Sequence, residues 1–247
     1  MFLLQASFLP LFGRALLIIG VVGGLQVLFA RLSFSREVKR RWQHALTGIA
    51  LVQVSYVLPV PWCGAALLAS TAALAYVIRY HHSAFVRAVG PLLRPHERRR
   101  GTWPGAGYFL VGTTVATLGF PLPHARYAVL CLSLADPMAS WVGRSVSSPK
   151  WHASASVAGC AACFGTALLV GMVYLSDDLP NLVVNSSGGV GTTTTTLATT
   201  TTMVVALTTN PKIWVGALAC TVAEALPFGN DNFLIPVLTG AAVTYCC

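Results

Sequence analysis

Residues 105–143 read GAGYFLVGTTVATLGFPLPHARYAVLCLSLADPMASWVG, and this stretch decides the fold class. Only Arg126 and Asp136 carry a formal charge in it, and a Pro-Leu-Pro turn divides it into two apolar segments. Each segment has nearly the ~20 residues that a helix needs to cross a bilayer. Because lipid cannot hydrogen-bond open backbone groups, such segments must be helical. The stretch therefore predicts two neighbouring membrane-spanning helices, at 105–121 and 125–143.

The rest of the chain has the same apolar character. Of its 247 residues, 55% are hydrophobic and 9% are charged, and the mean hydropathy is +0.69. A soluble domain carries about 25% charged residues, so a disordered chain, a disulfide scaffold and a soluble α/β enzyme are disfavoured. We expect an all-α, polytopic integral membrane protein with about seven to eight transmembrane helices. The further apolar segments are 12–30, 45–60, 62–78, 155–175, 203–227 and 233–245.

The basic residues lie in short segments between the apolar ones. The chain has 16 Lys and Arg residues against 7 Asp and Glu residues, and cytoplasmic loops of membrane proteins carry such an excess. Segments 31–44 and 79–104, with Arg144 and Lys150, are therefore assigned to the cytoplasmic side. Only Arg14, Arg126 and Lys212 then remain outside. This distribution favours the lipid bilayer as a partner and argues against nucleic acid.

The first apolar segment lacks a basic n-region and a small-residue cleavage site, so we predict a retained span and no cleaved signal peptide. Residues 1–35 are expected to form an N-terminal transmembrane helix with its basic segment, and residues 36–247 the main membrane domain. Residues 176–202, which include a Thr-rich tract and the glycosylation sequon at Asn185, are expected to form an external loop. The Thr-rich tract could instead extend the next span.

Three acidic residues, Asp136, Glu224 and Asp231, lie within or at the ends of apolar segments. Ionisable groups at membrane depth are costly and usually functional, although each one alone could be a helix-end acid solvated by headgroup water. The other four acids are assigned to polar loops, namely Glu37, Glu97, Asp177 and Asp178.

Asp136 begins a segment with the features of a phosphate site. Pro137 removes a backbone donor, so we expect an opened turn here. Small residues that allow close approach of a ligand follow it, and Arg144 offers a planar fork to phosphate oxygens. The small residues are Ala139, Ser140 and Gly143.

Four segments carry a family resemblance. They are Arg40-Arg41-Trp42-Gln43-His44-Ala45-Leu46-Thr47-Gly48, Gly107-Tyr108-Phe109-Leu110-Val111-Gly112, Asp136 to Arg144, and Glu224-Ala225-Leu226-Pro227-Phe228 with Asn230-Asp231-Asn232-Phe233-Leu234-Ile235-Pro236. In this order they resemble the CTP-dependent lipid kinases, which include dolichol kinase, phytol kinase and yeast-type diacylglycerol kinase. The Ala139-Ser140 pair is most similar to the diacylglycerol kinase branch.

The resemblance implies transfer of the γ-phosphate of CTP to a membrane lipid hydroxyl, with Mg²⁺ or another divalent cation. Diacylglycerol is the expected acceptor, which would give phosphatidic acid, and dolichol or phytol is the alternative. It also implies an endoplasmic reticulum membrane protein whose active site faces the cytosol.

The resemblance further implies roles for individual residues. Asp136 and Asp231 would hold the metal of the nucleotide, with Asn232 as an orienting group. His44 would donate to a phosphate or accept the hydroxyl proton, and Glu224 is the alternative base. The expected phosphate- and nucleotide-binding residues are Arg40, Arg41, Ala139, Gly143, Arg144, Lys150, Ser156 and Gly159.

One departure from the family pattern concerns a lysine. The family carries Lys-Ser-x-x-Gly after the aspartate motif, whereas this chain has Ala155-Ser156-Val157-Ala158-Gly159. Lys150 or His152 could reach the same anion. Without such a substitute, the protein would be catalytically impaired.

Two other functions fit the composition. A phosphatidate cytidylyltransferase is also a polytopic enzyme that uses CTP and Mg²⁺, but it makes a liponucleotide. A transporter or scaffold could use buried acids for ion coupling, and it would be expected to have similar acids in both halves of the chain. The first half has none within its apolar segments.

Overall fold

The computed structural model describes residues 2–150, 155–175, 210–227 and 229–246. Every regular element among them is a helix, and no β-strand is formed within these residues. The longer helices are α1 (Phe2–Arg31), α2 (Arg36–Val57), α3 (Val60–Tyr80), α5 (Gly105–Gly119), α8 (Val157–Tyr174), α11 (Pro211–Ala225) and α12 (Asp231–Tyr245). Shorter ones are α4 (His82–Val89), η1 (Gly90–Leu92), η2 (His96–Arg98), α6 (Leu122–Leu130), η3 (Cys131–Ala135) and α7 (Asp136–Ser145).

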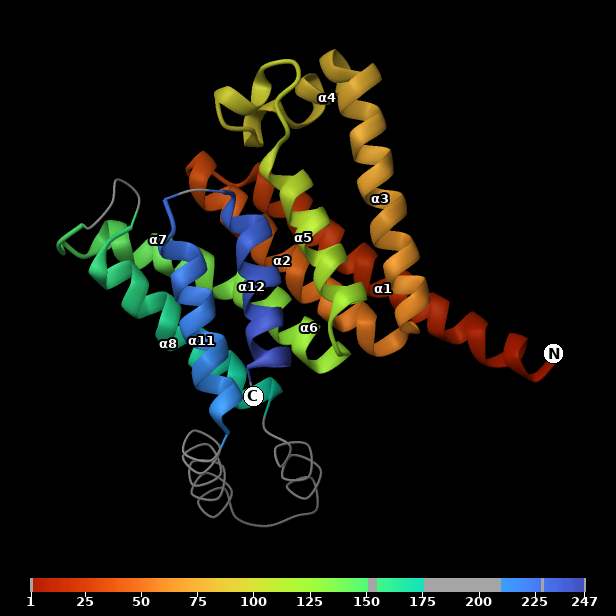
Figure 1. Cartoon of the computed structure of the whole chain (residues 1–247). Coiled ribbons are helices and arrows are strands. Elements are labelled where there is room, and N and C mark those ends of the chain that lie inside the picture. Colours follow the sequence, from red (N-terminus) through yellow and green to blue (C-terminus); the bar gives the residue numbers. More distant parts are fainter. Residues whose placement is uncertain (1, 151–154, 176–209, 228, 247) are drawn as a thin grey trace, which may run out of the picture.

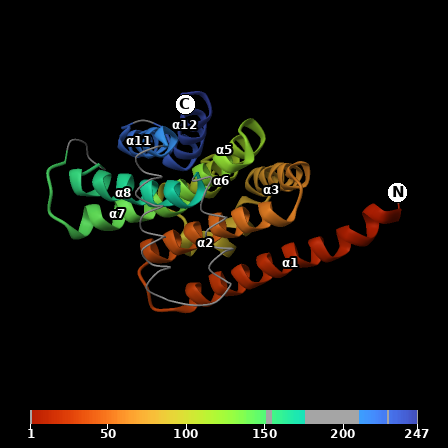
Figure 2. The same ribbon diagram turned by 90° about the horizontal axis from the view of Figure 1, so that it is seen from below.

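The helices form a bundle around the continuous α6–η3–α7 rod (Figures 1 and 2). Helix α11 packs against α8 and α12, α12 packs against α5, and α7 packs against α8. Helix α1 lies at the edge of the bundle, where it packs against α2. The core contains fully buried side chains from the rod and from the two C-terminal helices, among them Tyr127, Leu132, Ile213 and Ile235.

The chain does not open at Asp136, which corrects the turn expected from the sequence. It stays helical from Leu122 to Ser145, and the five residues before Asp136 form a π-helical segment, η3. Pro137 has no N–H group, and its ring would clash with a carbonyl in the preceding turn of an α-helix. A π-helical turn widens the backbone at that place, so the helix passes the proline without a break.

Three helices are long and apolar enough to cross a membrane, namely residues 10–29 of α1, α3 and α8. Helices α5, α11 and α12 have 15 residues each, or roughly 22 Å at 1.5 Å per residue. The predicted all-helical fold is confirmed for the described residues, with three helices that could span a membrane, whereas the count of seven to eight spans stays a prediction. Residues 176–202, with the expected external loop, and residues 203–209 lie outside the described residues.

The polar connections gather at one end of the bundle (Figure 1). This end carries the start of α2, the segment between α3 and α5, the C-terminal end of α7 and the α11–α12 connection. Helix α8 ends and α11 begins at the opposite end. The three basic segments that the sequence assigns to one side of the membrane thus share one end of the molecule.

Candidate active site

A cavity of about 880 Å³ lies at this polar end. Its lining comes from most elements of the bundle, including α2, α5, α7, α8 and the α11–α12 connection. Every site residue expected from the sequence lines it, namely Arg40, Arg41, His44, Asp136, Ala139, Gly143, Arg144, Lys150, Ser156, Gly159, Glu224, Asp231 and Asn232. Segments separated by almost 200 residues therefore meet around one space.

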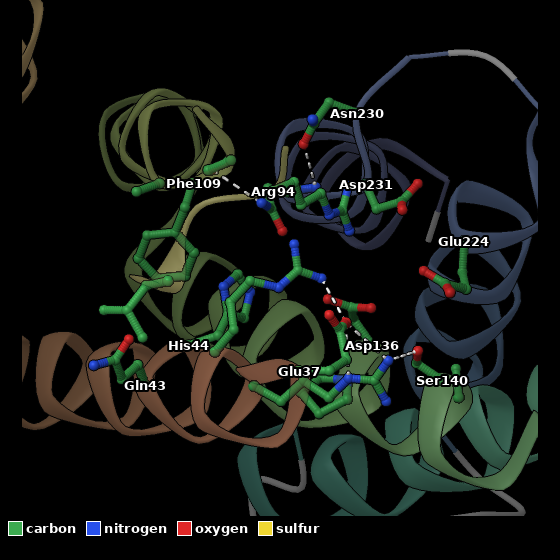
Figure 3. A pocket seen from close by; sticks show the side chains of 18 of the residues that line it. Glu37, Gln43, His44, Arg94, Phe109, Asp136, Ser140, Glu224, Asn230 and Asp231 are labelled. Atoms are coloured by element: carbon green, nitrogen blue, oxygen red, sulfur yellow. Dashed lines mark hydrogen bonds and ion pairs between the residues drawn. The ribbon is translucent and has the colours of Figure 1, made fainter. Parts of the chain in front are cut away.

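Of the five carboxyl groups that line this cavity, three come from α7, α11 and α12 (Figure 3). Asp136 begins α7, Glu224 lies in the last turn of α11, and Asp231 begins α12. The connection before α12 turns sharply because Gly229 adopts a left-handed conformation, with φ 88°. Asn230 then caps α12, since its Oδ1 accepts a hydrogen bond from the N–H of Asn232 at 3.1 Å.

The three acids interact electrostatically. At Asp231, which precedes the apolar part of α12, burial and the nearby Asp136 carboxyl raise the pKa to about 6, while Arg94 and Arg40 oppose this shift. The Oε2 atom of Glu224 is buried and has no hydrogen-bond partner among the described residues. Such an unsatisfied acceptor is expensive in the absence of a ligand.

The donor set fits a hard cation that arrives with a nucleotide. Carboxylate oxygens are the ligands that Mg²⁺ prefers, and Mg²⁺ usually takes only one or two of them and completes its shell with water and phosphate oxygens. Asp136 and Asp231 meet this requirement. Within the described residues, no three His, Cys, Asp or Glu side chains approach closely enough to hold a metal by themselves.

His44 lies on α2 beside the carboxyl groups. Its imidazole hydrogen-bonds the backbone of Leu132 in η3, where Pro137 leaves a carbonyl without a helical donor. The ring also packs edge-on against Phe109, with 4.6 Å between the ring centroids. Its Nε2 is buried and has no hydrogen-bond partner in the described part of the chain. A histidine that donates through Nδ1 presents the lone pair of Nε2 as a proton acceptor.

Glu37 gathers three arginines at the other side of the cavity. Its Oε1 lies 2.8 Å from Nη2 of Arg40, 3.2 Å from Nη2 of Arg41 and 3.3 Å from Nη2 of Arg144. Arg41 and Arg144 both also donate to the hydroxyl of Ser140. One carboxylate thus holds three cations in a cluster whose remaining donors suit a multiply charged anion.

Four small residues at the cavity wall permit close packing of α7 on α8. A Cβ on Gly143 would meet the Ser156 hydroxyl at 2.8 Å, and a Cβ on Gly159 would meet the Ala139 carbonyl at 2.8 Å. Ser156 also caps α8, because its Oγ accepts from the N–H of Gly159 at 3.2 Å. These contacts explain why Ala139, Gly143, Ser156 and Gly159 are small. Their role in nucleotide binding stays a prediction.

A comparison with known proteins bears on the family. The chain is 34% identical over 104 residues to CTP-dependent diacylglycerol kinase 1 of Schizosaccharomyces pombe, and the match covers 40% of this chain and 47% of the relative. The resemblance to the CTP-dependent lipid kinases, at the diacylglycerol kinase branch, is confirmed. The chain spans about half the length of the curated relative that it matches. No protein-family model and no solved structure matches the chain.

The structure shows where Lys150 lies relative to Ala155, the position of the missing family lysine. Lys150 lines the cavity, and its backbone pairs with that of Ser156 in an isolated bridge. It therefore lies beside Ala155, the position at which the lipid kinase family carries its lysine. Whether Lys150 replaces that lysine stays a prediction, and His152 lies outside the described residues.

Sequence reasoning missed several residues of the cavity. Glu37 was assigned to a polar loop, but it lies in the first turn of α2, and its spacing of three and four residues from Arg40 and Arg41 is a recognisable ion-pair signal. Glu97 was also assigned to a polar loop, yet it is only 6% exposed and lines the cavity. Arg94, which lines the cavity near Asp231, carried no signal that separated it from the other arginines of its loop.

Proposed function

We propose that this protein is a CTP-dependent lipid kinase that phosphorylates diacylglycerol to phosphatidic acid. The observation that carries the proposal is the meeting of the four family segments around one cavity, whose lining includes Asp136, Glu224 and Asp231, an arginine cluster and a histidine. This is the combination that phosphoryl transfer requires, because catalysis rests on positioning and on neutralising the phosphate charge.

The reaction assigns a task to each group. The cluster of Arg40, Arg41 and Arg144 binds the phosphates, while Asp136 and Asp231 would hold the Mg²⁺ that accompanies CTP. That ion would offset the charge on the β- and γ-phosphates. The lipid hydroxyl oxygen bonds to the γ-phosphorus, the bond from that phosphorus to the β–γ bridging oxygen breaks, and CDP leaves. Nε2 of His44 accepts the hydroxyl proton.

The membrane arrangement is part of the proposal. Seven to eight helices cross the bilayer, residues 36–247 form the kinase-like domain, and the end with the basic segments faces the cytosol. The active site then lies at the level of the lipid headgroups, where the acceptor hydroxyl is found. We place the protein in the endoplasmic reticulum membrane, within phosphatidic acid synthesis.

An acceptor and donor comparison tests the proposal. Purified full-length protein in mixed micelles is given diacylglycerol, dolichol or phytol, each with CTP or with ATP, and phosphorylated lipid is measured. We expect phosphatidic acid from diacylglycerol with CTP at a rate at least ten times that of every other pair. Faster phosphorylation of dolichol or phytol would overturn the acceptor assignment, and absence of any product would overturn the kinase assignment.

A further inference from the structure

Residues 79–104, from the last turn of α3 to the start of α5, contain six arginines, and one of them lies at the cavity. Arg94 lines the cavity, whereas the other five arginines of this segment do not. Figure 3 shows Arg94 on the Asp231 side of the cavity and Glu37, which gathers the other three arginines, on the Asp136 side. Arg94 interacts electrostatically with both Asp136 and Asp231. The five arginines outside the cavity are Arg79, Arg87, Arg98, Arg99 and Arg100.

A buried carboxylate fixes the backbone that carries Arg94. Oε2 of Glu97 accepts a hydrogen bond from the N–H of Arg94 at 2.8 Å, and Oε1 accepts one from the N–H of Gly105 at 2.8 Å. The side-chain amide of Asn232 donates to the Gly105 carbonyl at 2.9 Å. These three bonds connect the backbone at Arg94 to the start of α5, and the start of α5 to the residue after Asp231.

The unfavourable burial of the Glu97 carboxylate suggests that the position of Arg94 matters for function. Burying a carboxylate is unfavourable unless hydrogen bonds satisfy it. Both carboxylate oxygens of Glu97 accept hydrogen bonds from backbone N–H groups, those of Arg94 and Gly105. The result is a fixed backbone for an arginine that interacts electrostatically with Asp136 and Asp231, two carboxyl groups that would otherwise repel a triphosphate. An arginine here can offset that repulsion and bind phosphate oxygens through its planar fork.

On the basis of the proposed kinase function, we infer that Arg94 is a phosphate-binding residue for the nucleotide, and that Glu97 is the residue that positions it. Arg94 contacts the phosphates from the Asp231 side, while Arg40, Arg41 and Arg144 contact them from the Asp136 side. The triphosphate is then enclosed by cations on two sides, with the two aspartates between them.

A matched pair of variants tests the role of Arg94. Arg94→Gln and Arg98→Gln each remove one positive charge from an exposed side chain of the same segment. Equilibrium binding of Mg–CTP to the purified full chain is measured together with the KM values for CTP and for diacylglycerol. We expect Arg94→Gln to weaken Mg–CTP binding and raise the KM for CTP about tenfold or more, with the KM for diacylglycerol within twofold of wild type. Arg98→Gln should leave all three within twofold.

Equal changes in Mg–CTP binding for Arg94→Gln and Arg98→Gln would overturn the role of Arg94. A change in Arg94→Gln that is confined to the KM for diacylglycerol would also overturn it. The binding measurement also separates this inference from the kinase function. A wild-type protein that binds Mg–CTP but phosphorylates no lipid contradicts the proposed function, and Arg94→Gln still decides the inference.

A double-mutant cycle tests the role of Glu97. If Glu97 acts through Arg94, Glu97→Gln should weaken Mg–CTP binding severalfold, and the double variant should bind within twofold of Arg94→Gln alone. Losses that multiply in the double variant would show that Glu97 acts independently of Arg94, which would contradict a positioning role. Thermal unfolding of each variant identifies any loss that comes from misfolding.

Discussion

Asp136 lies where the π-helical segment ends, and its carboxyl faces Glu224 and Asp231 across the cavity (Figure 3). Its replacement by asparagine keeps the size of the side chain but removes the charge that would hold a cation. We expect Asp136→Asn to lower CTP-dependent lipid phosphorylation by a factor of about 100 or more. Membrane insertion and the thermal unfolding midpoint should stay near those of the wild type.

A control for Asp136→Asn is available on the same helix. Ser145 is exposed near the end of α7 and does not line the cavity, so Ser145→Ala should retain wild-type activity. Full activity in the Asp136→Asn protein would remove this aspartate from the site.

Lys150 is the second residue whose role can be measured directly. A lost charge-assisted phosphate contact costs roughly 1.5–3 kcal/mol, and each 1.4 kcal/mol is about tenfold in rate. Lys150→Ala should therefore raise the KM for CTP, or lower kcat, by about tenfold or more. Adding Ala155→Lys should restore part of the loss, because it rebuilds the pattern of the lipid kinase family.

The wild-type activity has to be measured before these variants. If Lys150→Ala has no effect, the phosphates are held without this lysine. If the wild-type chain is inactive and Ala155→Lys alone confers activity, the chain is a catalytically impaired relative of the lipid kinases.

Among the helices, the α7–α8 contact supports one wall of the cavity. A methyl group on Gly159 would meet the backbone carbonyl of Ala139 at 2.8 Å, and this atom can move only with α7. We expect Gly159→Ala to lower the free energy of unfolding by about 1–3 kcal/mol, the usual cost of overpacking, and to reduce lipid phosphorylation.

The matched control is Gly165→Ala on the same helix. Nothing lies within 4 Å of a Cβ at Gly165, and alanine favours helix over glycine by about 1 kcal/mol. This variant should be as stable as the wild type or more stable. The measurement is thermal unfolding of the purified protein in detergent, and equal midpoints for the two variants would show that α7 and α8 are not tightly packed here.

Most helices could be predicted from apolar segments, because a bilayer imposes helix on any such stretch. The predicted segment at 155–175 corresponds to α8, and Pro211 begins α11 behind the Asn210 cap. The passage through Pro137 could not be predicted in this way. A proline inside a helix removes a backbone hydrogen bond and commonly ends or kinks the helix, so the sequence predicts an opened turn at Pro137, whereas the folded chain continues there through a π-helical segment.

The candidate site was predictable to the extent that its residues follow a family pattern. Asp136, Glu224 and Asp231 stood out because an acid inside an apolar segment is costly. Glu97 lies in a basic, polar segment, so nothing in its neighbours indicates that it is buried. Its burial depends on backbone groups at Arg94 and Gly105 that only the folded chain brings to it.

The arrangement of the whole molecule predicts which end of the bundle lies on which side of the membrane. The basic segments and the cavity share one end, and α8 ends and α11 begins at the other (Figure 1). Asn185, which follows α8 in the sequence, should therefore be glycosylated in microsomes, and a cysteine in its place (Asn185→Cys) should react with an impermeant thiol reagent from the lumenal side. A cysteine introduced at Arg98 should react with an impermeant thiol reagent only from the cytosolic side. Labelling of both positions from one side would contradict the arrangement of spans.

The position of the label in CTP distinguishes a lipid kinase from a cytidylyltransferase. Membranes that contain the protein are incubated with diacylglycerol and with CTP labelled either in the γ- or in the α-phosphate. A kinase transfers only the γ-phosphate, so we predict labelled phosphatidic acid from γ-labelled CTP and no labelled lipid from α-labelled CTP, and the label from γ-labelled CTP should fall by a factor of about 100 or more in the Asp136→Asn protein. Label in the lipid from α-labelled CTP, with none from γ-labelled CTP, would show a cytidylyltransferase and contradict the account.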